Sequence, residues 1–273
     1  MFCYRHPDRA AYVRCQRCER YICPECQTEA AVGFLCPDDA GISRFQQVAA
    51  PLTPAPVQRL LRSDKPVVTY SIILLCGLIW GLQLLLGDQF TYLGIYTPFA
   101  TTLEPWRMIT SAFLHSPNSP VHILFNMYML WVFGRELEQL LGRGKFIALY
   151  LISAFGGSVS VLLLASAGTY VYGASGAIYG LMGAYFVVLR SLGASSRSLV
   201  GTIAINLVFS FLIQGVSWQA HVGGLISGAA VAWVYSRNRG QAEASRLIKH
   251  VLAVVGALLL ITALGVVRLG LGF

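Results

Sequence analysis

One serine and one histidine in this chain stand where apolar stretches begin, and together they could carry out nucleophilic catalysis. Ser175 lies between Gly173 and Gly176 at the start of one apolar run, and His221 stands near the start of another. A neutral imidazole within hydrogen-bond reach can take the serine proton during attack and return it to a leaving amine. Glycines beside the serine permit tight turning and close approach by a substrate chain. The pair therefore predicts a nucleophile and its general base.

The surroundings of Ser175 predict a way to stabilise an oxyanion. The backbone N–H groups of a first helical turn have no intrahelical partners and carry positive dipole character, so they suit a developing negative charge. In a second apolar segment, His122 and Asn126 are four residues apart and share one helical face, so both can point into one cavity. Each of these residues alone would be ordinary helix packing. Their combination in three segments, all toward the same side, favours one common site.

The elements that must position these residues are membrane helices. The 273 residues are 56% hydrophobic and 12% charged, with a mean hydropathy of +0.62, which is far more apolar than soluble domains. The net charge of +8 comes from cations placed between apolar segments, which disfavours nucleic acid as a partner. We expect an all-α polytopic protein in the lipid bilayer. The predicted spans are residues 67–86, 119–138, 146–166, 174–190, 199–214, 218–236 and 249–268.

The distribution of Lys and Arg predicts the orientation of these spans. Cations precede the first span and occupy every second connection, whereas the connections 167–173 and 215–217 carry none. Because cytoplasmic connections are enriched in Lys and Arg, we expect the N-terminus inside and the C-terminus outside, with the bacterial plasma membrane as the location. Ser175, His122 and His221 then share the outer side. The aromatic-rich loop 87–118 is expected to be either an interfacial belt or a loop partly embedded beside the site.

The ordered motifs resemble those of the rhomboid family of intramembrane serine proteases over residues 67–236. They are His122-Ile123-Leu124-Phe125-Asn126, Gly173-Ala174-Ser175-Gly176 and Ala220-His221-Val222-Gly223-Gly224. The resemblance implies that Ser175 is the nucleophile, His221 the general base, and His122 and Asn126 the oxyanion-hole side chains. It also implies that Tyr179 packs against the histidine ring, and that neither an acidic third member nor a cofactor takes part in catalysis.

The resemblance further implies a six-helix core with one C-terminal helix in residues 237–273, and cleavage of transmembrane protein substrates near the outer face. Trp106-Arg107 and the segment from Gly134 to Glu138 resemble family motifs for which we expect a supporting role. The stretch from His115 to His122, with two prolines, follows the family only in outline. It leaves His115 without an assigned role.

Residues 1–40 predict a separate zinc-binding unit, followed by a Pro-containing linker over residues 41–66. Six of the seven cysteines lie between residues 3 and 36, and clustered cysteines in a reducing compartment indicate metal ligands before disulfides. Eight ligands suit two tetrahedral Zn²⁺ sites, and so small a unit needs metal to fold, so both ions are expected to be structural. The ligand pairs are Cys3-x-x-His6, Cys15-x-x-Cys18, Cys23-x-x-Cys26 and Cys36-x-x-Asp39.

This unit resembles the cross-braced B-box type of zinc finger, in which the first pair joins the third and the second joins the fourth. The resemblance implies one site of Cys3, His6, Cys23 and Cys26, and another of Cys15, Cys18, Cys36 and Asp39. The neighbouring Asp38 is an alternative for the last ligand. A protein partner is the expected use of the unit, ahead of nucleic acid.

Two other functions are weighed against the protease. One is a catalytically silent rhomboid-like protein that binds membrane clients, which the presence of both Ser175 and His221 disfavours. The other is a transporter or channel, which the scarcity of charged residues in the spans and the lack of an inverted repeat disfavour.

Overall fold

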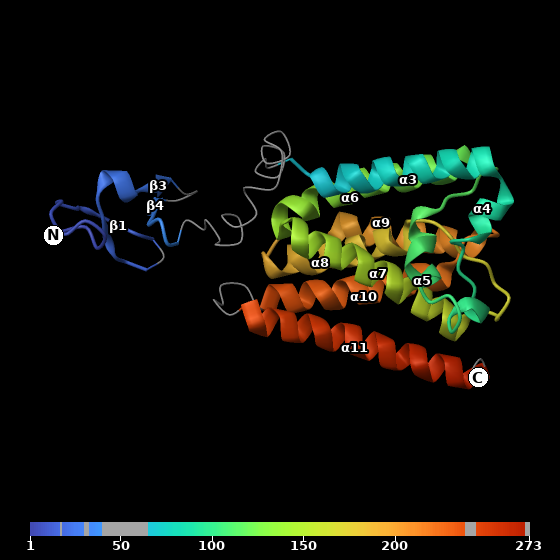
Figure 1. Cartoon of the computed structure of the whole chain (residues 1–273). Coiled ribbons are helices and arrows are strands. Elements are labelled where there is room, and N and C mark those ends of the chain that lie inside the picture. Colours follow the sequence, from blue (N-terminus) through green and yellow to red (C-terminus); the bar gives the residue numbers. More distant parts are fainter. Residues whose placement is uncertain (17, 30–32, 40–64, 238–243, 271–273) are drawn as a thin grey trace. The chain divides into compact units, whose positions relative to one another are not determined.

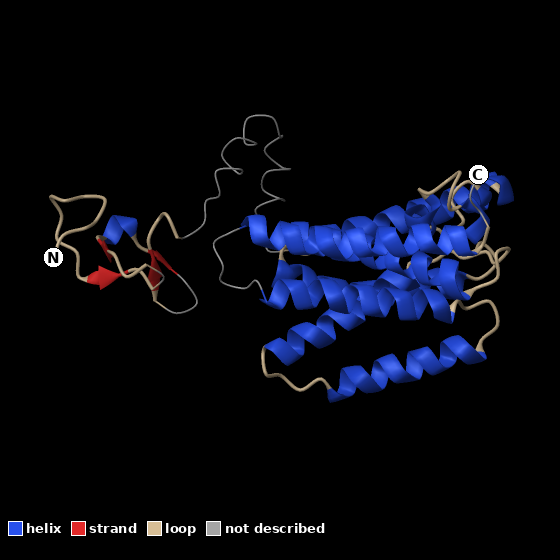
Figure 2. Cartoon of the chain, turned by 90° about the horizontal axis from the view of Figure 1, so that it is seen from below, coloured by secondary structure: helices blue, strands red, loops and turns tan. Residues whose placement is uncertain are grey.

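A computed structural model of the chain describes residues 1–16, 18–29, 33–39, 65–237 and 244–270. The chain divides into two compact units, Met1–Ser63 and Asp64–Phe273. Within the described residues, the strands belong to the first unit and the long helices to the second (Figures 1 and 2). The predicted linker lies almost wholly outside the described residues, as does most of the connection that follows residue 237.

The N-terminal unit contains two very short antiparallel hairpins. Strand β1 (Val13–Arg14) pairs with β2 (Tyr21–Ile22), and β3 (Thr28–Glu29) pairs with β4 (Phe34–Leu35), with the 3-10 turn η1 (Pro24–Cys26) between the hairpins. Isolated two-stranded ribbons are marginal in water. The buried core consists mostly of cysteine side chains rather than large apolar ones. In domains of this size, ligated metal commonly supplies the stability that so small an apolar core lacks.

The second unit is a bundle in which each predicted span lies on a helix. The long helices are α3 (Val67–Leu86), α6 (Pro120–Leu141), α7 (Arg143–Leu164), α8 (Ser175–Ser191), α9 (Arg197–Leu212), α10 (Trp218–Arg237) and α11 (Ala244–Arg268). Shorter elements join α3 to α6: α4 (Asp88–Tyr92), η2 (Pro98–Ala100), α5 (Arg107–Thr110) and η3 (Ser111–Phe113). Helix α6 runs three residues past the predicted end and stops at Gly142, whose φ of 81° favours glycine.

Three of the described helices are long and apolar enough to cross a membrane by length and composition alone. They are α3, α7 and the segment Leu247–Arg268 of α11, and α9 is apolar but only 16 residues long. Helix α8 has only 17 residues, while α6 and α10 contain polar residues and glycines that lower their hydropathy. The helices that carry the candidate site are therefore the ones that simple hydropathy misses.

Helix α8 forms the centre of the bundle, and glycines set its distance from α10. Residues 176–184 of α8 are buried without interruption. A Cβ on Gly224 would collide with the carbonyl of Gly176, and a Cβ on Gly228 would collide with that of Gly180. Small residues at such contacts allow two backbones to approach closely. This packing brings the starts of α8 and α10 together.

The outer helices expose apolar side chains over much of their length. In α9 only Leu199 and Ser210 are buried, and α11 is mostly exposed. Leu85, Phe209 and Leu260 are each more than half exposed. In water such surfaces would aggregate, so they fit contact with lipid.

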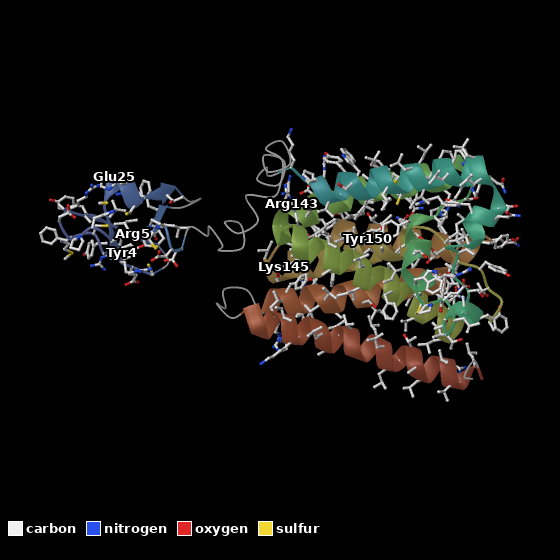
Figure 3. All side chains as sticks on the ribbon, viewed as in Figure 1. Tyr4, Arg5, Glu25, Arg143, Lys145 and Tyr150 are labelled. Carbon is white, nitrogen blue, oxygen red and sulfur yellow. The ribbon has the colours of Figure 1, made fainter. Side chains whose placement is uncertain are left out.

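The loop between α3 and α6 is fastened to the chain that leads into α8. Tyr96 and Val171 exchange two backbone hydrogen bonds, and the N–H of Gly173 donates to the Ser111 carbonyl. The Tyr96 side chain is fully buried, whereas Trp106 is exposed, so the aromatic residues of this loop serve both inward packing and the surface. From inside the bundle, Tyr150 of α7 donates to the Ala112 carbonyl of the same loop (Figure 3).

Candidate active site and metal centres

The side chains of Ser175 and His221 meet at the junction of α8 and α10. Ser175 is the first residue of α8, and His221 lies in the first turn of α10. The distance between Ser175 Oγ and His221 Nε2 is 2.8 Å, which is hydrogen-bond length. The imidazole is 5% exposed. A nucleophile and a base in contact are the minimum for acyl transfer.

Two further side chains hold the imidazole. The Tyr179 ring, one turn along α8, stacks on the His221 ring at 4.2 Å between centroids with an interplanar angle of 13°. Ser210 of α9 lies 2.6 Å from His221 Nδ1. Sequence reasoning did not single out Ser210. The signal was a polar stripe, Thr202, Asn206 and Ser210, at four-residue intervals in an otherwise apolar helix.

His122 lies beside the serine with its Nε2 nitrogen directed at the turn before α8. Its Nδ1 accepts a hydrogen bond from the Ser116 backbone N–H at 3.1 Å. Because a neutral imidazole carries one proton, that proton is then on Nε2. A Cβ on Gly173 would lie 3.0 Å from His122 Nε2 and 3.8 Å from Ser175 Oγ. A donor therefore faces the space next to the Ser175 hydroxyl.

Asn126 lies one turn further along α6 on the same face. Its amide nitrogen donates to the His122 carbonyl at 2.8 Å, and the residue is 4% exposed. An amide nitrogen has two hydrogens, so one stays available after this bond. The first N–H groups of α8, which begin at Ser175, also lack intrahelical acceptors. These donors together can surround an oxyanion.

A cavity of about 720 Å³ opens onto all four predicted residues. Its walls come from α6, α8, α9, α10 and the segments that precede α6, α8 and α10. Apolar side chains such as Phe125, Met129 and Phe209 line it, with Tyr172 and Gln214 among the polar ones. The volume is within the range of cavities that hold small ligands or a short peptide segment.

His115 is buried next to this site without a hydrogen bond to its ring. Both ring nitrogens lack a partner among the described residues, and the ring centroid lies 5.3 Å from that of His122. Burial, followed by the nearby His122, lowers the pKa of His115 to about 3. The backbone N–H of His115 donates to the Gln83 side chain of α3. His115 therefore supports the wall behind His122 as a neutral ring.

The N-terminal unit brings the predicted ligands into two clusters whose ligand atoms lie within 4.8 Å of one another. They are Cys3, His6, Cys23 and Cys26, and Cys15, Cys18, Cys36 and Asp39. In the first cluster, His6 Nδ1 is 3.4 Å from the sulfurs of Cys23 and Cys26 and 3.9 Å from that of Cys3. A tetrahedral zinc site has N–S edges of about 3.6 Å and S–S edges of about 3.8 Å, from the usual bond lengths. The donor set and its spacing fit zinc.

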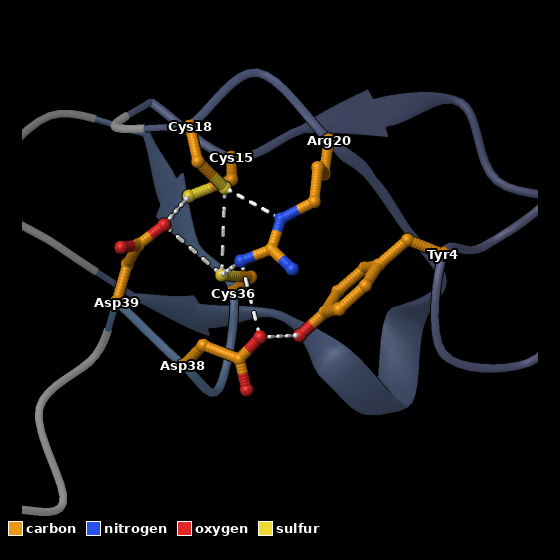
Figure 4. A network of polar contacts seen from close by, with 7 residues as sticks. All are labelled: Tyr4, Cys15, Cys18, Arg20, Cys36, Asp38 and Asp39. Carbon is orange, nitrogen blue, oxygen red and sulfur yellow. Dashed lines mark hydrogen bonds and ion pairs between the residues drawn. The ribbon is translucent and has the colours of Figure 1, made fainter.

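The second cluster contains the Asp39 carboxylate, not that of Asp38 (Figure 4). Asp39 Oδ2 lies 3.2 Å from the Cys15 sulfur and 3.1 Å from the Cys36 sulfur, and the Cys18 and Cys36 sulfurs are 3.7 Å apart. Burial raises the pKa of the Cys36 thiol to about 11. A bound cation would supply the charge that keeps such a thiol ionised at neutral pH.

Arg20 flanks this second cluster with its guanidinium. Its Nε donates to the Cys18 sulfur at 3.1 Å, and the group also pairs with Asp38 at 3.0 Å and stacks over the Tyr4 ring at 4.1 Å (Figure 4). Three thiolates and a carboxylate around Zn²⁺ leave two excess negative charges. With Zn²⁺ bound, Arg20 would offset part of that excess, and Asp38 holds the guanidinium.

Comparison with known proteins gives one family and a set of curated relatives. The family model described as the Rhomboid domain matches residues 102–238. "Rhomboid protease GlpG" of Yersinia pestis (strain Pestoides F) is 34% identical over 190 residues, covering 65% of this chain and 66% of that protein. The protein of the same name from Klebsiella pneumoniae (strain 342) is 34% identical over 186 residues, covering 64% and 65%. The chain thus spans slightly less than two thirds of these relatives.

Proposed function

The chain belongs to the rhomboid family, and from this premise we propose that it is an intramembrane serine protease that hydrolyses peptide bonds in transmembrane proteins. It is an all-α polytopic membrane protein. The observation that carries the proposal is the 2.8 Å contact between Ser175 Oγ and His221 Nε2 at a cavity among apolar helices. A catalytically silent client-binding protein has no use for that contact, which supports the enzyme over this alternative.

The proposed reaction proceeds through an acyl-enzyme. Ser175 Oγ attacks the substrate carbonyl carbon while His221 Nε2 takes the hydroxyl proton. The carbonyl oxygen becomes an oxyanion that His122 Nε2–H, the Asn126 amide and the first N–H groups of α8 stabilise. Collapse breaks the C–N bond, and His221 returns the proton to the departing amine. Water then attacks the ester, with His221 again as the base, and restores the Ser175 hydroxyl.

The location of the site supports cleavage near the outer face of the membrane. Arg143 and Lys145 begin α7 at one end of the bundle (Figure 3), where α3 also begins and α8 ends. Ser175, His122 and His221 stand at the starts of α8, α6 and α10, at the opposite end. Because Lys and Arg favour the cytoplasmic side, the N-terminus is proposed to be cytoplasmic and the C-terminus outside. The seven long helices then cross the bacterial plasma membrane as a six-span core plus α11.

The N-terminal unit is proposed to hold two structural zinc ions. One ion would be bound by Cys3, His6, Cys23 and Cys26, and the other by the cluster that contains Cys36 and Asp39. All four positions of each tetrahedron are filled by protein, so the metal supplies cross-links for folding and no open position for water. Catalysis is proposed to use no cofactor. A protein partner for this unit stays a prediction.

The test uses the purified full chain reconstituted in lipid. The parent, Ser175→Ala, His221→Ala and the control Ser236→Ala are compared for cleavage of a tagged transmembrane substrate and for labelling by a fluorophosphonate. Ser236 is a partly exposed serine at the far end of α10. We expect cleavage and labelling in the parent and control only. Labelling of His221→Ala at the parental rate, or cleavage by Ser175→Ala, would falsify the assignment.

A further inference from the structure

The Ser210 hydroxyl makes two polar contacts beyond the usual bond of a helical serine to the carbonyl four residues back. The residue is 4% exposed and lies two residues before the end of α9. Its Oγ lies 2.6 Å from His221 Nδ1, 3.2 Å from the Tyr179 hydroxyl and 2.9 Å from the Asn206 carbonyl. Thr202, two turns earlier on the same helix, has one side-chain hydrogen bond within the described residues, to the carbonyl four residues back. Such a back-bond is the ordinary use of a helical hydroxyl, so the other two contacts of Ser210 need a separate reason.

Counting hydrogens assigns a direction to each of these contacts. A serine hydroxyl has one hydrogen and two acceptor lone pairs. Because a carbonyl oxygen can only accept, all three contacts can be hydrogen bonds only if that hydrogen goes to the Asn206 carbonyl. The oxygen must then accept from both remaining partners, so Tyr179 donates its hydroxyl hydrogen and His221 donates from Nδ1–H. A neutral imidazole with its proton on Nδ1 has a free lone pair on Nε2, and Nε2 is the atom that faces Ser175.

We propose that Ser210 is a positioning residue that fixes His221 in the Nδ1–H tautomer, so that Nε2 is free to take the Ser175 proton. This inference rests on the proposed protease function and adds a third side chain to the dyad. The third side chain is a neutral hydroxyl from another helix, where an acidic group would stand in a Ser-His-Asp triad. Tyr179 then acts twice, since its ring stacks on the imidazole and its hydroxyl orients the acceptor that the imidazole uses.

A neutral acceptor suits this position. His221 is buried among helices that are proposed to lie in the membrane, where an unpaired carboxylate would be costly. A hydroxyl that accepts two hydrogen bonds fixes the tautomer without adding a charge. It also stabilises the imidazolium that forms when His221 takes the serine proton, because that cation keeps Nδ1–H as a donor.

The test separates this role from a structural one by reading the tautomer directly. The full chain is labelled with ¹⁵N-histidine, and the His221 signals are assigned by their loss in His221→Ala. Ring ¹⁵N shifts distinguish Nδ1–H from Nε2–H imidazole. Ser210→Ala removes the acceptor, Ser210→Thr keeps a hydroxyl whose added methyl can enter the adjoining cavity, and Thr202→Val is the matched control. The kcat and KM for the transmembrane substrate are measured for each.

We expect the parent, the control and Ser210→Thr to show the Nδ1–H tautomer, and Ser210→Ala to show a mixture. We expect kcat of Ser210→Ala to fall about tenfold and KM to stay unchanged. A tenfold fall in kcat corresponds to the loss of about one hydrogen bond in the transition state. A parent with Nε2–H, or a Ser210→Ala enzyme with parental kcat and tautomer, overturns the role of Ser210 and leaves the protease proposal intact. A parent that neither cleaves substrate nor takes the fluorophosphonate label overturns the protease proposal itself. If Ser210→Thr does not fold, the comparison of the parent with Ser210→Ala still decides the question.

Discussion

The carboxylate of Glu138, near the end of α6, accepts hydrogen bonds from both the backbone N–H and the hydroxyl of Thr69 in α3, at 2.7 and 2.8 Å. Its other oxygen accepts from the Val68 N–H at 2.9 Å. Helix α3 begins after Pro66 without a side-chain cap of its own. Glu138, from another helix, therefore supplies the hydrogen-bond acceptors for the first N–H groups of α3 that an N-cap side chain would otherwise supply.

We therefore expect Glu138→Ala to destabilise the bundle by about 2–3 kcal/mol, because it leaves buried N–H groups of α3 unpaired. The control is Glu136→Ala, which removes an exposed pairing with Arg135 and should cost less than about 1 kcal/mol. Both are measured by unfolding of the full chain in detergent. Equal stability of the two variants would show that the cap is not what Glu138 contributes.

Substitution at Gly173 should impair the site more than the fold. Its φ of 131° is a conformation that suits glycine, and a Cβ would lie 3.0 Å from His122 Nε2. Such strain costs on the order of 1–3 kcal/mol, and the shift falls on the proposed oxyanion donor. We expect kcat of Gly173→Ala to fall at least about tenfold. Gly168→Ala, in the same connection with open space around it, should keep parental kcat.

The packing of α8 against α10 should depend on Gly224. A Cβ there meets the Gly176 carbonyl, so Gly224→Ala must push apart the helices that carry Ser175 and His221. Overpacking of this kind typically costs about 1–3 kcal/mol. We expect a lower unfolding midpoint together with weaker fluorophosphonate labelling. Gly256→Ala, on the open surface of α11, should change neither, and a normal Gly224→Ala protein would contradict the close-packing argument.

The metal content of the purified chain should be two zinc ions. Cys3→Ala and Cys36→Ala each remove a ligand from a different cluster, so each variant should hold at most one tightly bound ion. Cys76→Ala, which removes a buried cysteine of α3 outside both clusters, should keep two. Elemental analysis after dialysis gives the count. A parent free of zinc and other divalent metals would contradict the metal assignment.

His115 should make the bundle sensitive to acid. The pKa of His115 is lowered from 6.5 to about 3 in the folded chain, so unfolding takes up a proton between these values. The free energy of unfolding then falls by about 1.4 kcal/mol per unit as the pH drops below 6.5, and the stabilisation is fully present only above it. His115→Phe should flatten this dependence, measured as the unfolding midpoint from pH 7 to pH 4. A His115→Phe protein that loses stability on acidification as steeply as the parent would contradict this prediction.

The helices and most residues of the candidate sites can be predicted from the sequence alone, because the patterns that indicate them lie within single short segments. Apolar runs predict the bundle, and the ends of α3, α8 and α10 lie within one residue of the spans predicted from the sequence. Motif spacing within single segments picks out Ser175, His221, His122 and Asn126, and the structure brings all four to one cavity. The same holds for the cysteine pairs, whose two-residue spacing is a local property of metal-binding turns.

Only the tertiary structure decides which residues from different helices meet. Ser210 and Glu138 have partners in other helices, and neither the 11-residue separation from His221 nor the 69-residue separation from Thr69 leaves a periodic pattern in the sequence. The choice of Asp39 over Asp38 in the second cluster depends likewise on where the chain folds back toward Cys15. A hydrogen bond needs two atoms within about 3 Å, and that proximity is set by helix packing rather than by residue type.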